Sequence, residues 1–396
     1  MDSERKIADT FVEEKTSAGT TPVEEPVLLS EYDYVLPPER IAQEPVEPRD
    51  SSRLLVVPRF GDSFTHRFFR DLPELLRPDD LLVVNNTRVS AIRLWGNRRS
   101  GGNVEALLLR PIMDADGSPN TFAALIRPAK RVRIGDILEF ADAGLSAEVA
   151  GVTPEGGRVL RFFPMESDAT SQEANAEKSG GLAENTVFNR LEKAGRVPLP
   201  PYIEKPLENA ERYQTVYAKT PGSAAAPTAG LHFTERLLEE LRVRGVRIAS
   251  VQLDVGLGTF RPIREDNVRH HEMHEETLVV SEETADAVNG CSGRVVAVGT
   301  TTLRALETAA IALEQSNPGA GGRRVPAFTG ATRLFVYPGY SFRAVDALIT
   351  NFHQPRSTLL LLVAAFAGRD TMRNAYQTAL REPYRFLSFG DAMFIA

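Results

Sequence analysis

The stretch VVAVGTTTLRALETAAIAL, residues 295–313, decides the fold because it joins two hydrophobic patterns through a polar turn. Its first part, 295–299, is an apolar run of strand length, whereas 302–313 carries a longer pattern that predicts a buried helix. The same alternation predicts strands at 81–84, 247–253 and 345–350 and a helix at 357–367. Strands that alternate with helices indicate an α/β domain with a largely parallel sheet. Such domains bind ligands at the carboxyl ends of their strands.

Between residues 89 and 163 the pattern changes to short apolar or alternating runs separated by glycine, proline and aspartate. The runs lie at 104–109, 122–126, 137–140, 147–152 and 159–163. Several short strands at close spacing, without a long helical period, predict a small β-barrel or sandwich. We therefore predict a discontinuous α/β domain, 29–88 and 186–396, with an inserted small β-barrel at 89–164.

The formal net charge of −7 is concentrated in two segments. Residues 1–28 hold seven acidic and three basic side chains, and residues 165–185 hold five acidic side chains and one lysine. Both segments are poor in large apolar residues, so we expect a disordered N-terminal extension and a disordered linker. The rest of the chain has a net charge of +1, which leaves its basic clusters able to contact phosphates.

Composition limits the class of protein. The single cysteine, Cys291, excludes an intramolecular disulfide framework and is consistent with a reducing compartment. The longest apolar run, 359–367, is too short to cross a bilayer, and the first residues contain no apolar signal core. We therefore expect a cytoplasmic protein without a membrane partner. A length of 396 residues favours two domains.

The segment AAPTAGLHFT, residues 225–234, has the features of a binding loop. Its glycine permits close approach of a ligand, and the helix that follows offers unpaired N–H groups at its start. Three leucines on one face, a threonine N-cap and a terminal glycine predict this helix: Leu237, Leu238, Leu241, Thr234 and Gly245. The alternative is an ordinary junction with His232 and Phe233 in the core.

Other loops at strand ends also carry polar side chains. The turn 299–302, followed by Arg304 and Glu307, can hold a carboxylate or phosphate, although N-capping by threonine explains it equally well. A third loop, NFHQPRST, occupies 351–358. The segment VGLGTFRP, 255–262, lacks the third glycine and the following helix of a dinucleotide fingerprint. The sequence contains neither a Walker phosphate loop nor a nucleophile elbow.

A histidine cluster lies in HHEMHEE, residues 270–276. Its order does not match the His-Glu-x-x-His pattern and no cysteine is near, so we expect no metal site. Because imidazole titrates near neutral pH, we favour acid–base or hydrogen-bonding work. The alternative is partly exposed loop histidines with no catalytic role.

Twelve sequence blocks between Glu31 and residue 396 carry a family resemblance. They read EYDYVLPPERIAQEPVEPRDSSRLLVV, NNTRV, RPAK, PLPPYI, ERYQTVYA, AAPTAGLHFT, VGLGTFRP, HEMHEE, VGTTTLRALE, VYPGY, ITNFHQPRSTLLLLVAAFAG and YRFLSFGDAMFIA. In this order they resemble the S-adenosylmethionine:tRNA ribosyltransferase-isomerase family of the queuosine pathway. The resemblance implies that ribosyl is transferred from S-adenosylmethionine to 7-aminomethyl-7-deazaguanine at the tRNA wobble position and isomerised. The product is epoxyqueuosine, with adenine and methionine released. It also implies an α/β domain with a small inserted β-barrel.

This implied chemistry assigns roles to residues. A sulfonium group acidifies the neighbouring 5′-carbon, so a base must remove a proton, and departing adenine needs an acid or a hydrogen-bond donor. The candidate catalytic residues are His232, His271, His274, His353, Glu276 and Glu307. A sulfonium cation favours an aromatic face. The aromatic candidates are Phe233, Phe260, Tyr213 and Tyr340.

Further residues are expected to bind the substrates. The methionine carboxylate suits the helix start at Thr300 and Thr301, with Arg304. A flipped-out base needs stacking and edge hydrogen bonds, and the anticodon stem-loop needs cations. The cations are Arg88, Arg127 and Lys130, and the other candidates are Asn86, Arg212, Thr228, Gly230, Gly256, Gly258, Thr259 and Asn351. The expected partners are S-adenosylmethionine, as co-substrate, and tRNA that carries the deazaguanine. We expect a monomer without a permanently bound cofactor or metal.

The chain departs from the family pattern at a few positions. Asp254 stands where a histidine is usual, beside the presumed site. Ser90-Ala91-Ile92 replaces Ile-Pro-Ala, and Gln354 and Arg356 replace an aliphatic residue and a lysine. Two alternatives follow: a catalytically inactive RNA-binding relative, which Asp254 keeps open, and a metal-dependent hydrolase that uses the segment 270–276.

Overall fold

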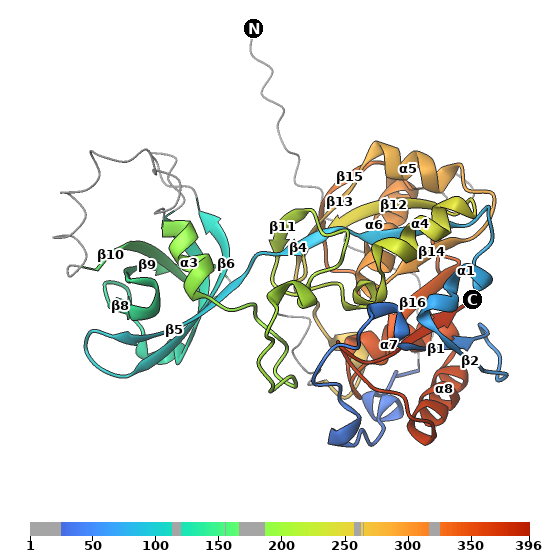
Figure 1. Cartoon of the computed structure of the whole chain (residues 1–396), viewed down its shortest axis with the longest axis horizontal. Helices are drawn as coiled ribbons and strands as arrows, with labels where there is room; N and C mark the ends of the chain where they lie inside the picture. The colour runs from blue at the N-terminus through green and yellow to red at the C-terminus, as the bar shows by residue number, and fades with distance from the viewer. Residues whose placement is uncertain are drawn as a thin grey trace, which may run out of the picture. The chain divides into compact units, whose positions relative to one another are not determined.

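The computed structural model describes residues 25–112, 120–154, 156–165, 187–256, 263, 265–316 and 325–396. The chain divides into two compact units (Figure 1). The first consists of the chain up to Arg88 with Pro200–Thr220 and Ala226–Ala396, and the second of Val89–Leu199 and Pro221–Ala225. The acidic segments expected to be disordered, 1–28 and 165–185, lie outside the described residues except for 25–28 and Met165.

A nine-stranded mixed sheet forms the centre of the first unit. In spatial order its strands are β15 (Phe328–Thr332), β13 (Glu276–Val280), β12 (Arg247–Leu253), β3 (Leu81–Asn85), β14 (Val295–Val298), β16 (Ala347–Asn351), β17 (Ala392–Ile395), β1 (Arg53–Val57) and β2 (Thr65–Phe68). The four neighbours β12, β3, β14 and β16 are parallel, as is the pair β17 and β1, whereas the other pairs are antiparallel. The predicted α/β class is confirmed, with a sheet that is parallel at its centre and mixed overall.

The direction of β17 is one reason why the sheet is mixed rather than largely parallel. Two consecutive helices, α7 (Thr358–Ala367) and α8 (Arg369–Arg381), lie between β16 and β17. The chain therefore does not make the single-helix crossover that keeps neighbouring strands parallel, and β17 runs antiparallel to β16.

The central strands β3, β14 and β16 are buried along their whole length, as is typical of a sheet whose faces are covered by helices. The further α-helices of this unit are α1 (Leu72–Leu75), α4 (Glu235–Val243), α5 (Glu282–Asn289) and α6 (Thr300–Ser316). One hydrophobic cluster joins Leu82 and Val84 of β3 to Leu237 and Leu241 of α4. The strands and helices expected at 81–84, 247–253, 295–313, 345–350 and 357–367 correspond to β3, β12, β14 with α6, β16 and α7.

Local sequence sets the ends of α4. Thr234 is its N-cap, because its hydroxyl accepts a hydrogen bond from the Leu237 N–H at 3.1 Å. Gly245, just beyond its C-terminus, has a φ of 91°, a conformation that favours glycine. Both predictions for this helix are confirmed.

The second unit contains a closed antiparallel barrel of six strands. They are β5 (Ile92–Arg98), β6 (Asn103–Ile112), β7 (Thr121–Arg127), β8 (Ile137–Phe140), β9 (Leu145–Val152) and β10 (Arg158–Pro164), in the spatial order β10-β7-β6-β5-β8-β9. The predicted β-barrel is confirmed. Gly96 has a packing reason, since a Cβ there would lie 2.5 Å from the Glu139 carbonyl oxygen.

The observed second unit extends past residue 164, where the sequence analysis ended the barrel. Helix α3 (Val187–Ala194) belongs to it because the fully buried Leu191 joins the barrel core. Strands β4 (Thr87–Val89) and β11 (Thr220–Ser223), in each of which the chain passes from the first unit to the second, pair with each other. No helix in the described part of the chain is long and apolar enough to span a membrane.

Candidate active site

The candidate site lies at one edge of the nine-stranded sheet. The carboxyl ends of β12, β3, β14 and β16 share this edge because the strands are parallel. Strand β17 pairs Ala392 with Asn351 at the end of β16, and β1 pairs Leu54 with Ala392. Residues just before β1 and β17 therefore reach the same edge.

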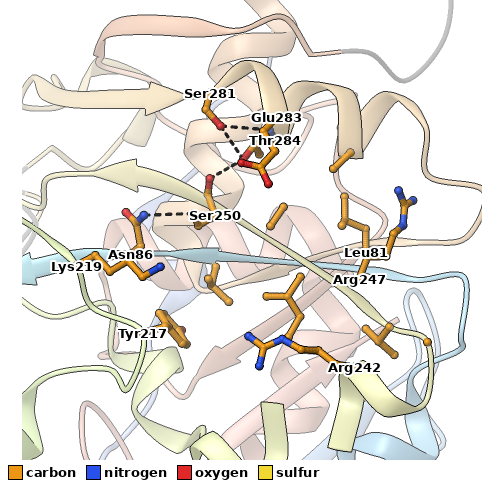
Figure 2. Close-up of a pocket in the computed structure, with 16 residues that line it drawn as sticks. Leu81, Asn86, Tyr217, Lys219, Arg242, Arg247, Ser250, Ser281, Glu283 and Thr284 are labelled. Carbon is orange, nitrogen blue, oxygen red and sulfur yellow. Dashed lines mark hydrogen bonds between the residues drawn. The ribbon is translucent and has the colours of Figure 1, made fainter. Parts of the chain in front are cut away.

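A pocket of about 690 Å³ is present between α4 and α5 (Figure 2). Its lining includes Asn86 and Tyr217 together with three cations, Lys219, Arg242 and Arg247. Asn86 is the one predicted substrate-binding residue among the residues that line it. Other predicted residues meet elsewhere, in one group around His232 and in another around Arg304.

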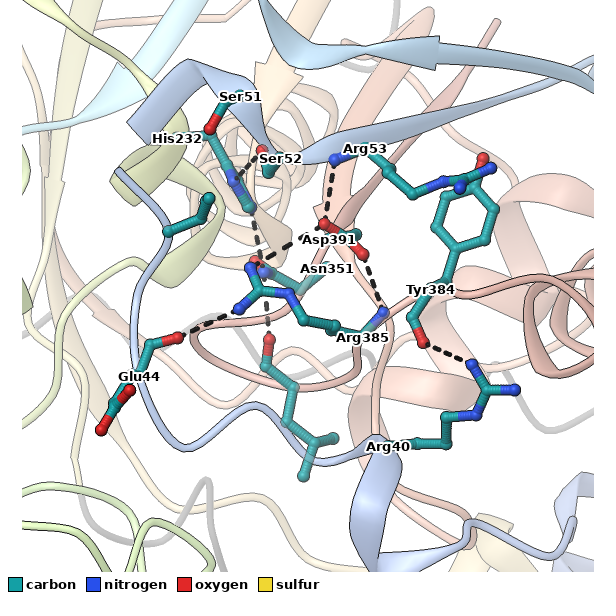
Figure 3. A network of polar contacts seen from close by, with 12 residues as sticks. Arg40, Glu44, Ser51, Ser52, Arg53, His232, Asn351, Tyr384, Arg385 and Asp391 are labelled. Carbon is teal, nitrogen blue, oxygen red and sulfur yellow. Dashed lines mark hydrogen bonds and ion pairs between the residues drawn. The ribbon is translucent and has the colours of Figure 1, made fainter. Parts of the chain in front are cut away.

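Figure 3 shows the polar network around His232. Its Nδ1 lies 2.8 Å from Ser52 Oγ, and its Nε2 lies 3.2 Å from Asn351 Nδ2. Asn351 Nδ2 also donates to the Leu387 carbonyl at 3.2 Å, which orients the amide because a carbonyl oxygen only accepts. The amide nitrogen therefore donates to Nε2, and this network assigns the proton of the neutral imidazole to Nδ1, facing Ser52.

The surroundings of His232 keep its ring neutral. The side chain is buried and stacks on Phe69, with ring centroids 4.9 Å apart. Burial, followed by the positive charges of Arg385 and Arg49, lowers the pKa of His232 to about 3. At neutral pH this histidine is an uncharged group with a partner on each nitrogen.

This low pKa predicts how stability changes with pH. Between about 3, the pKa of His232 in the folded state, and about 6.5, its unfolded value, only the unfolded chain binds the proton. The contribution of His232 to the free energy of unfolding is therefore fully present above pH 6.5. As the pH is lowered through the window, this contribution decreases by about 1.4 kcal/mol per pH unit. Urea titrations at several pH values give the free energy of unfolding of the wild type and of His232→Gln. We expect the wild-type free energy to decrease more steeply as the pH is lowered from 6.5. Equal slopes against pH would contradict the low pKa of His232.

The AAPTAGLHFT loop reaches the end of β16 through Thr228. Its hydroxyl donates to Asn351 Oδ1 at 3.4 Å. Phe233, in contrast, is fully buried and packs edge-on against Phe69 and Tyr217. Its ring contributes to the hydrophobic core and presents no open face to a ligand.

Gly230 is required by the ring of Tyr217. A Cβ at residue 230 would lie 2.0 Å from Tyr217 Oη. We expect Gly230→Ala to lower the free energy of unfolding by about 1–3 kcal/mol through overpacking, as measured by urea denaturation. Adding Tyr217→Phe removes the nearest clashing atom and should restore part of the loss. No restoration in the double variant would show that another contact is responsible.

Asn85 connects three elements at the sheet edge. Its Nδ2 donates to the Leu253 carbonyl at 2.9 Å and to Thr301 Oγ1 at 3.4 Å, and its Oδ1 accepts from the Leu253 N–H at 3.1 Å. The ends of β3 and β12 are thereby tied to the start of α6. Thr300 and Thr301, the predicted anion-binding pair, form that start.

Arg304 and Glu276 form a buried ion pair, with side chains 5% and 3% exposed. Glu276 Oε1 also accepts from the Gly256 N–H at 3.0 Å, and Arg304 Nε donates to the Leu334 carbonyl at 2.9 Å. Arg304 Nη2 is buried and has no hydrogen-bond partner among the described residues. Three predicted residues, Arg304, Glu276 and Gly256, thus meet at one point.

Glu307 has a different environment. Its carboxylate accepts hydrogen bonds from the Tyr340 hydroxyl at 3.0 Å and from the N–H groups of Arg343, Ala344 and Val345. Burial raises the pKa of Glu307, and these hydrogen bonds oppose the rise. The oxygens of the Glu307 carboxylate therefore bind the segment 340–345, which leads into β16.

The other candidate histidines make different contacts. His353 Nε2 contacts Thr350 Oγ1 at 2.8 Å, and burial lowers the pKa of His353 to about 3. His271 Nδ1 lies 3.2 Å from Glu265 Oε2, and its ring packs edge-on against Phe335. The carbonyl of Leu334 accepts from Arg304, so His271 and Arg304 contact consecutive residues, Phe335 and Leu334. His274 is exposed.

The remaining predicted substrate-binding residues lie in several environments. Arg88 pairs with Glu211, and Arg212 Nε lies 2.6 Å from Glu47 Oε1. Tyr213 is fully buried against Phe389. Arg127 and Lys130 are exposed on the barrel unit. Three predicted residues lie outside the described part of the chain: Gly258, Thr259 and Phe260.

Asp254, the departure beside the site, is held by hydrogen bonds. It accepts from Thr87 Oγ1 at 2.7 Å, from Gln252 Nε2 at 3.2 Å and from Thr277 Oγ1 at 3.3 Å. The acid is thus accommodated by three donors. Within the described ranges, no group of three or more His, Cys, Asp or Glu side chains is arranged to hold a metal ion.

Comparison with known proteins identifies the family. The model of the family described as queuosine biosynthesis protein matches residues 29–395. An S-adenosylmethionine:tRNA ribosyltransferase-isomerase from Moorella thermoacetica is 50% identical over 371 residues, which is 93% of this chain and 99% of the relative. This chain belongs to the queuosine biosynthesis protein family.

Two further proteins are similar to this chain. The S-adenosylmethionine:tRNA ribosyltransferase-isomerase of Symbiobacterium thermophilum is 49% identical, over 93% of this chain and 99% of the relative. A crystal structure of S-adenosylmethionine tRNA ribosyltransferase from Thermotoga maritima is 36% identical, covering 92% of this chain and 100% of that chain, with a TM-score of 0.48.

Sequence reasoning missed two residues of this site. Ser52 and Asp391 lie just before apolar runs that form β1 and β17. Asp391 accepts from the N–H groups of Arg53 and Arg385 at 2.9 and 2.7 Å. The sequence shows a polar residue before each of these strands. It does not show in which direction the strand runs, and that direction decides which edge of the sheet the residue reaches.

Proposed function

We propose that this protein acts as an S-adenosylmethionine:tRNA ribosyltransferase-isomerase. It transfers the ribosyl part of S-adenosylmethionine to 7-aminomethyl-7-deazaguanine at the tRNA wobble position and isomerises it to epoxyqueuosine. Adenine and methionine leave. The observation that carries this proposal is the 50% identity to a relative of that name over nearly the full length of both chains.

The geometry of the sheet edge supports the same reaction. Side chains at the ends of β3 and β16 and at the start of α6 lie at one edge together with the AAPTAGLHFT loop. A substrate in contact with this edge would meet groups from several segments at once, as ligands of α/β sheets do. Asp254 is held by three donors, so the fold at this edge accommodates an acid at that position.

We assign the general base to His271. Its Nδ1 faces the Glu265 carboxylate at 3.2 Å, an arrangement that holds the ring and leaves Nε2 to accept a proton. His232 is less suited, because its Nε2 already accepts from Asn351 and burial keeps its pKa low. We therefore give His232 the role of orienting Asn351.

Arg304 and the start of α6 are the proposed site for the methionine carboxylate. The buried Arg304 Nη2 has donors without a described partner, and the first turn of α6 contributes N–H groups from Thr300 and Thr301. Glu276, which orients Arg304, then acts as a positioning residue. Glu307 and Tyr340, whose polar atoms bind each other, are proposed to support the fold.

The barrel is proposed to contact the anticodon stem-loop through Arg127 and Lys130. The loop that follows Arg127 is fixed by two arginines: Arg98 Nη1 donates to the Arg131 carbonyl at 3.3 Å, and Arg158 Nη2 to the Ala129 carbonyl at 3.0 Å. Exposed cations on a fixed loop suit phosphate binding.

The purified protein, S-adenosylmethionine and tRNA bearing the aminomethyl-deazaguanine base provide the test. We expect equimolar adenine and methionine, measured by liquid chromatography, and a matching gain in tRNA mass. A tRNA with guanine at the wobble position is the control substrate. Absence of adenine release with the deazaguanine tRNA would refute the proposal.

Further proposals concern the state of the enzyme. We propose a cytoplasmic monomer that needs no metal and no permanently bound cofactor. Light scattering after gel filtration measures the oligomeric state, and turnover after dialysis against a chelator measures the need for metal. A dimer, or loss of turnover that zinc restores, would refute the corresponding proposal.

A further inference from the structure

The pocket between α4 and α5 has no part in the reaction steps proposed above. Its volume of about 690 Å³ lies in the range of ligand sites. Residues of β3 and β12 line it together with residues from both flanking helices (Figure 2). It adjoins the site, because Asn86 directly follows Asn85 and the Tyr217 hydroxyl lies over Gly230.

Positive charge dominates the lining of this pocket. Lys219, Arg242 and Arg247 line it, and Glu283 is the one acidic lining residue. Arg247 Nη2 donates to a main-chain carbonyl after α5 at 3.2 Å, and Arg242 pairs with Glu239 at 3.3 Å. Since each guanidinium has five N–H donors, both arginines keep donors for an anion.

The same pocket also offers an acceptor and an apolar surface. Asn86 Nδ2 donates to Ser250 Oγ at 3.2 Å, whereas the buried Asn86 Oδ1 has no hydrogen-bond partner among the described residues. A buried amide oxygen without a donor is unfavourable, so a ligand N–H or O–H there would be stabilising. Tyr217 and Ile248 add apolar lining.

We propose that this pocket binds a nucleotide of the tRNA substrate other than the one that is modified. The cations Lys219, Arg242 and Arg247 take its phosphodiester, Tyr217 contacts its base, and Asn86 Oδ1 accepts from a base amino group or a ribose 2′-hydroxyl. A nucleotide carries all three groups that this pocket can bind: a phosphate, a flat ring and a hydrogen-bond donor. This inference rests on the proposed function, which makes tRNA the substrate.

The test measures RNA binding and turnover in the same variants. Arg242→Ala and Arg247→Ala should each weaken binding of an anticodon stem-loop RNA about tenfold, as measured by fluorescence anisotropy. Each should also reduce the slope of log affinity against log salt by about 1. The KM for S-adenosylmethionine and the kcat at saturating RNA should stay at wild-type values.

Arg373→Ala is the matched control. Arg373 lies on α8 and pairs with Asp370, three residues before it, as Arg242 pairs with Glu239. Its side chain is 49% exposed and that of Arg242 is 55% exposed. We expect this control to bind RNA like the wild type. Thermal melting checks that every variant is folded.

Two outcomes would overturn the inference. One is RNA affinity in the pocket variants equal to that of Arg373→Ala. The other is a raised KM for S-adenosylmethionine with unchanged RNA affinity, which would assign the pocket to the co-substrate. Failure of the proposed function is distinguishable, because the wild type itself would then release no adenine.

Discussion

Arg304→Met is expected to lower the free energy of unfolding by about 3–5 kcal/mol, because it leaves the Glu276 carboxylate buried without its charged partner. Both side chains are almost inaccessible, so water cannot replace the guanidinium. Urea denaturation of the wild type and the variant measures the loss. Arg99→Met is a matched control, since Arg99 pairs with Glu139 at 2.9 Å on the barrel surface, and the expected loss is about 0–1 kcal/mol.

The double variant Arg304→Met with Glu276→Leu separates stability from binding. Replacing both charges by apolar side chains should recover most of the lost stability. The KM for S-adenosylmethionine should be above the wild-type value in the single and in the double variant, because both lack the guanidinium of the proposed carboxylate site. A double variant with restored stability and a wild-type KM would show that Arg304 serves the fold alone.

His271→Ala is expected to lower kcat by about 10²–10⁴-fold if His271 is the general base. The free energy of unfolding is measured in parallel, because the His271 side chain is only 17% exposed and its ring packs edge-on against Phe335. Single-turnover adenine release measures the chemical step. His274→Ala, which removes an exposed imidazole three residues away, is the control and should keep wild-type kcat.

Glu265→Gln tests how His271 is oriented. An amide in place of the carboxylate should cost about 10–100-fold in kcat, less than loss of the imidazole. A wild-type rate for both His271→Ala and Glu265→Gln would exclude this pair. The base would then be sought at His232, and Asn351→Ala would be the next variant.

Much of the fold was predictable because its signals are local. The run at 295–299 and the pattern at 302–313 reflect burial of one strand and one helix, and both are found in β14 and α6. Thr234 and Gly245 act on neighbouring backbone groups, so the ends of α4 also follow from sequence. The direction of β17 could not be predicted this way, because it depends on how two helices pack after β16.

The candidate site was predictable only in part, for the same reason. Glu276 and Arg304 were both named, but their pairing crosses 28 residues of sequence and depends on the order of β13 and α6. Glu307 has the residue type of a catalytic acid, yet its side chain is directed at the N–H groups of Arg343 and its neighbours. Ser52 joins His232 across 180 residues, a contact that no local pattern contains.

The position of β17 has a consequence for synthesis of the chain. Ala392–Ile395 is buried between β16 and β1, and it pairs with β1 from Leu54 to Val57. Domains generally fold as units during translation. On the ribosome, β2 follows β1 closely, whereas the other neighbour of β1, β17, is made more than three hundred residues later. A nascent chain that stops before Ala392 therefore lacks the strand that joins β16 to β1 in the sheet.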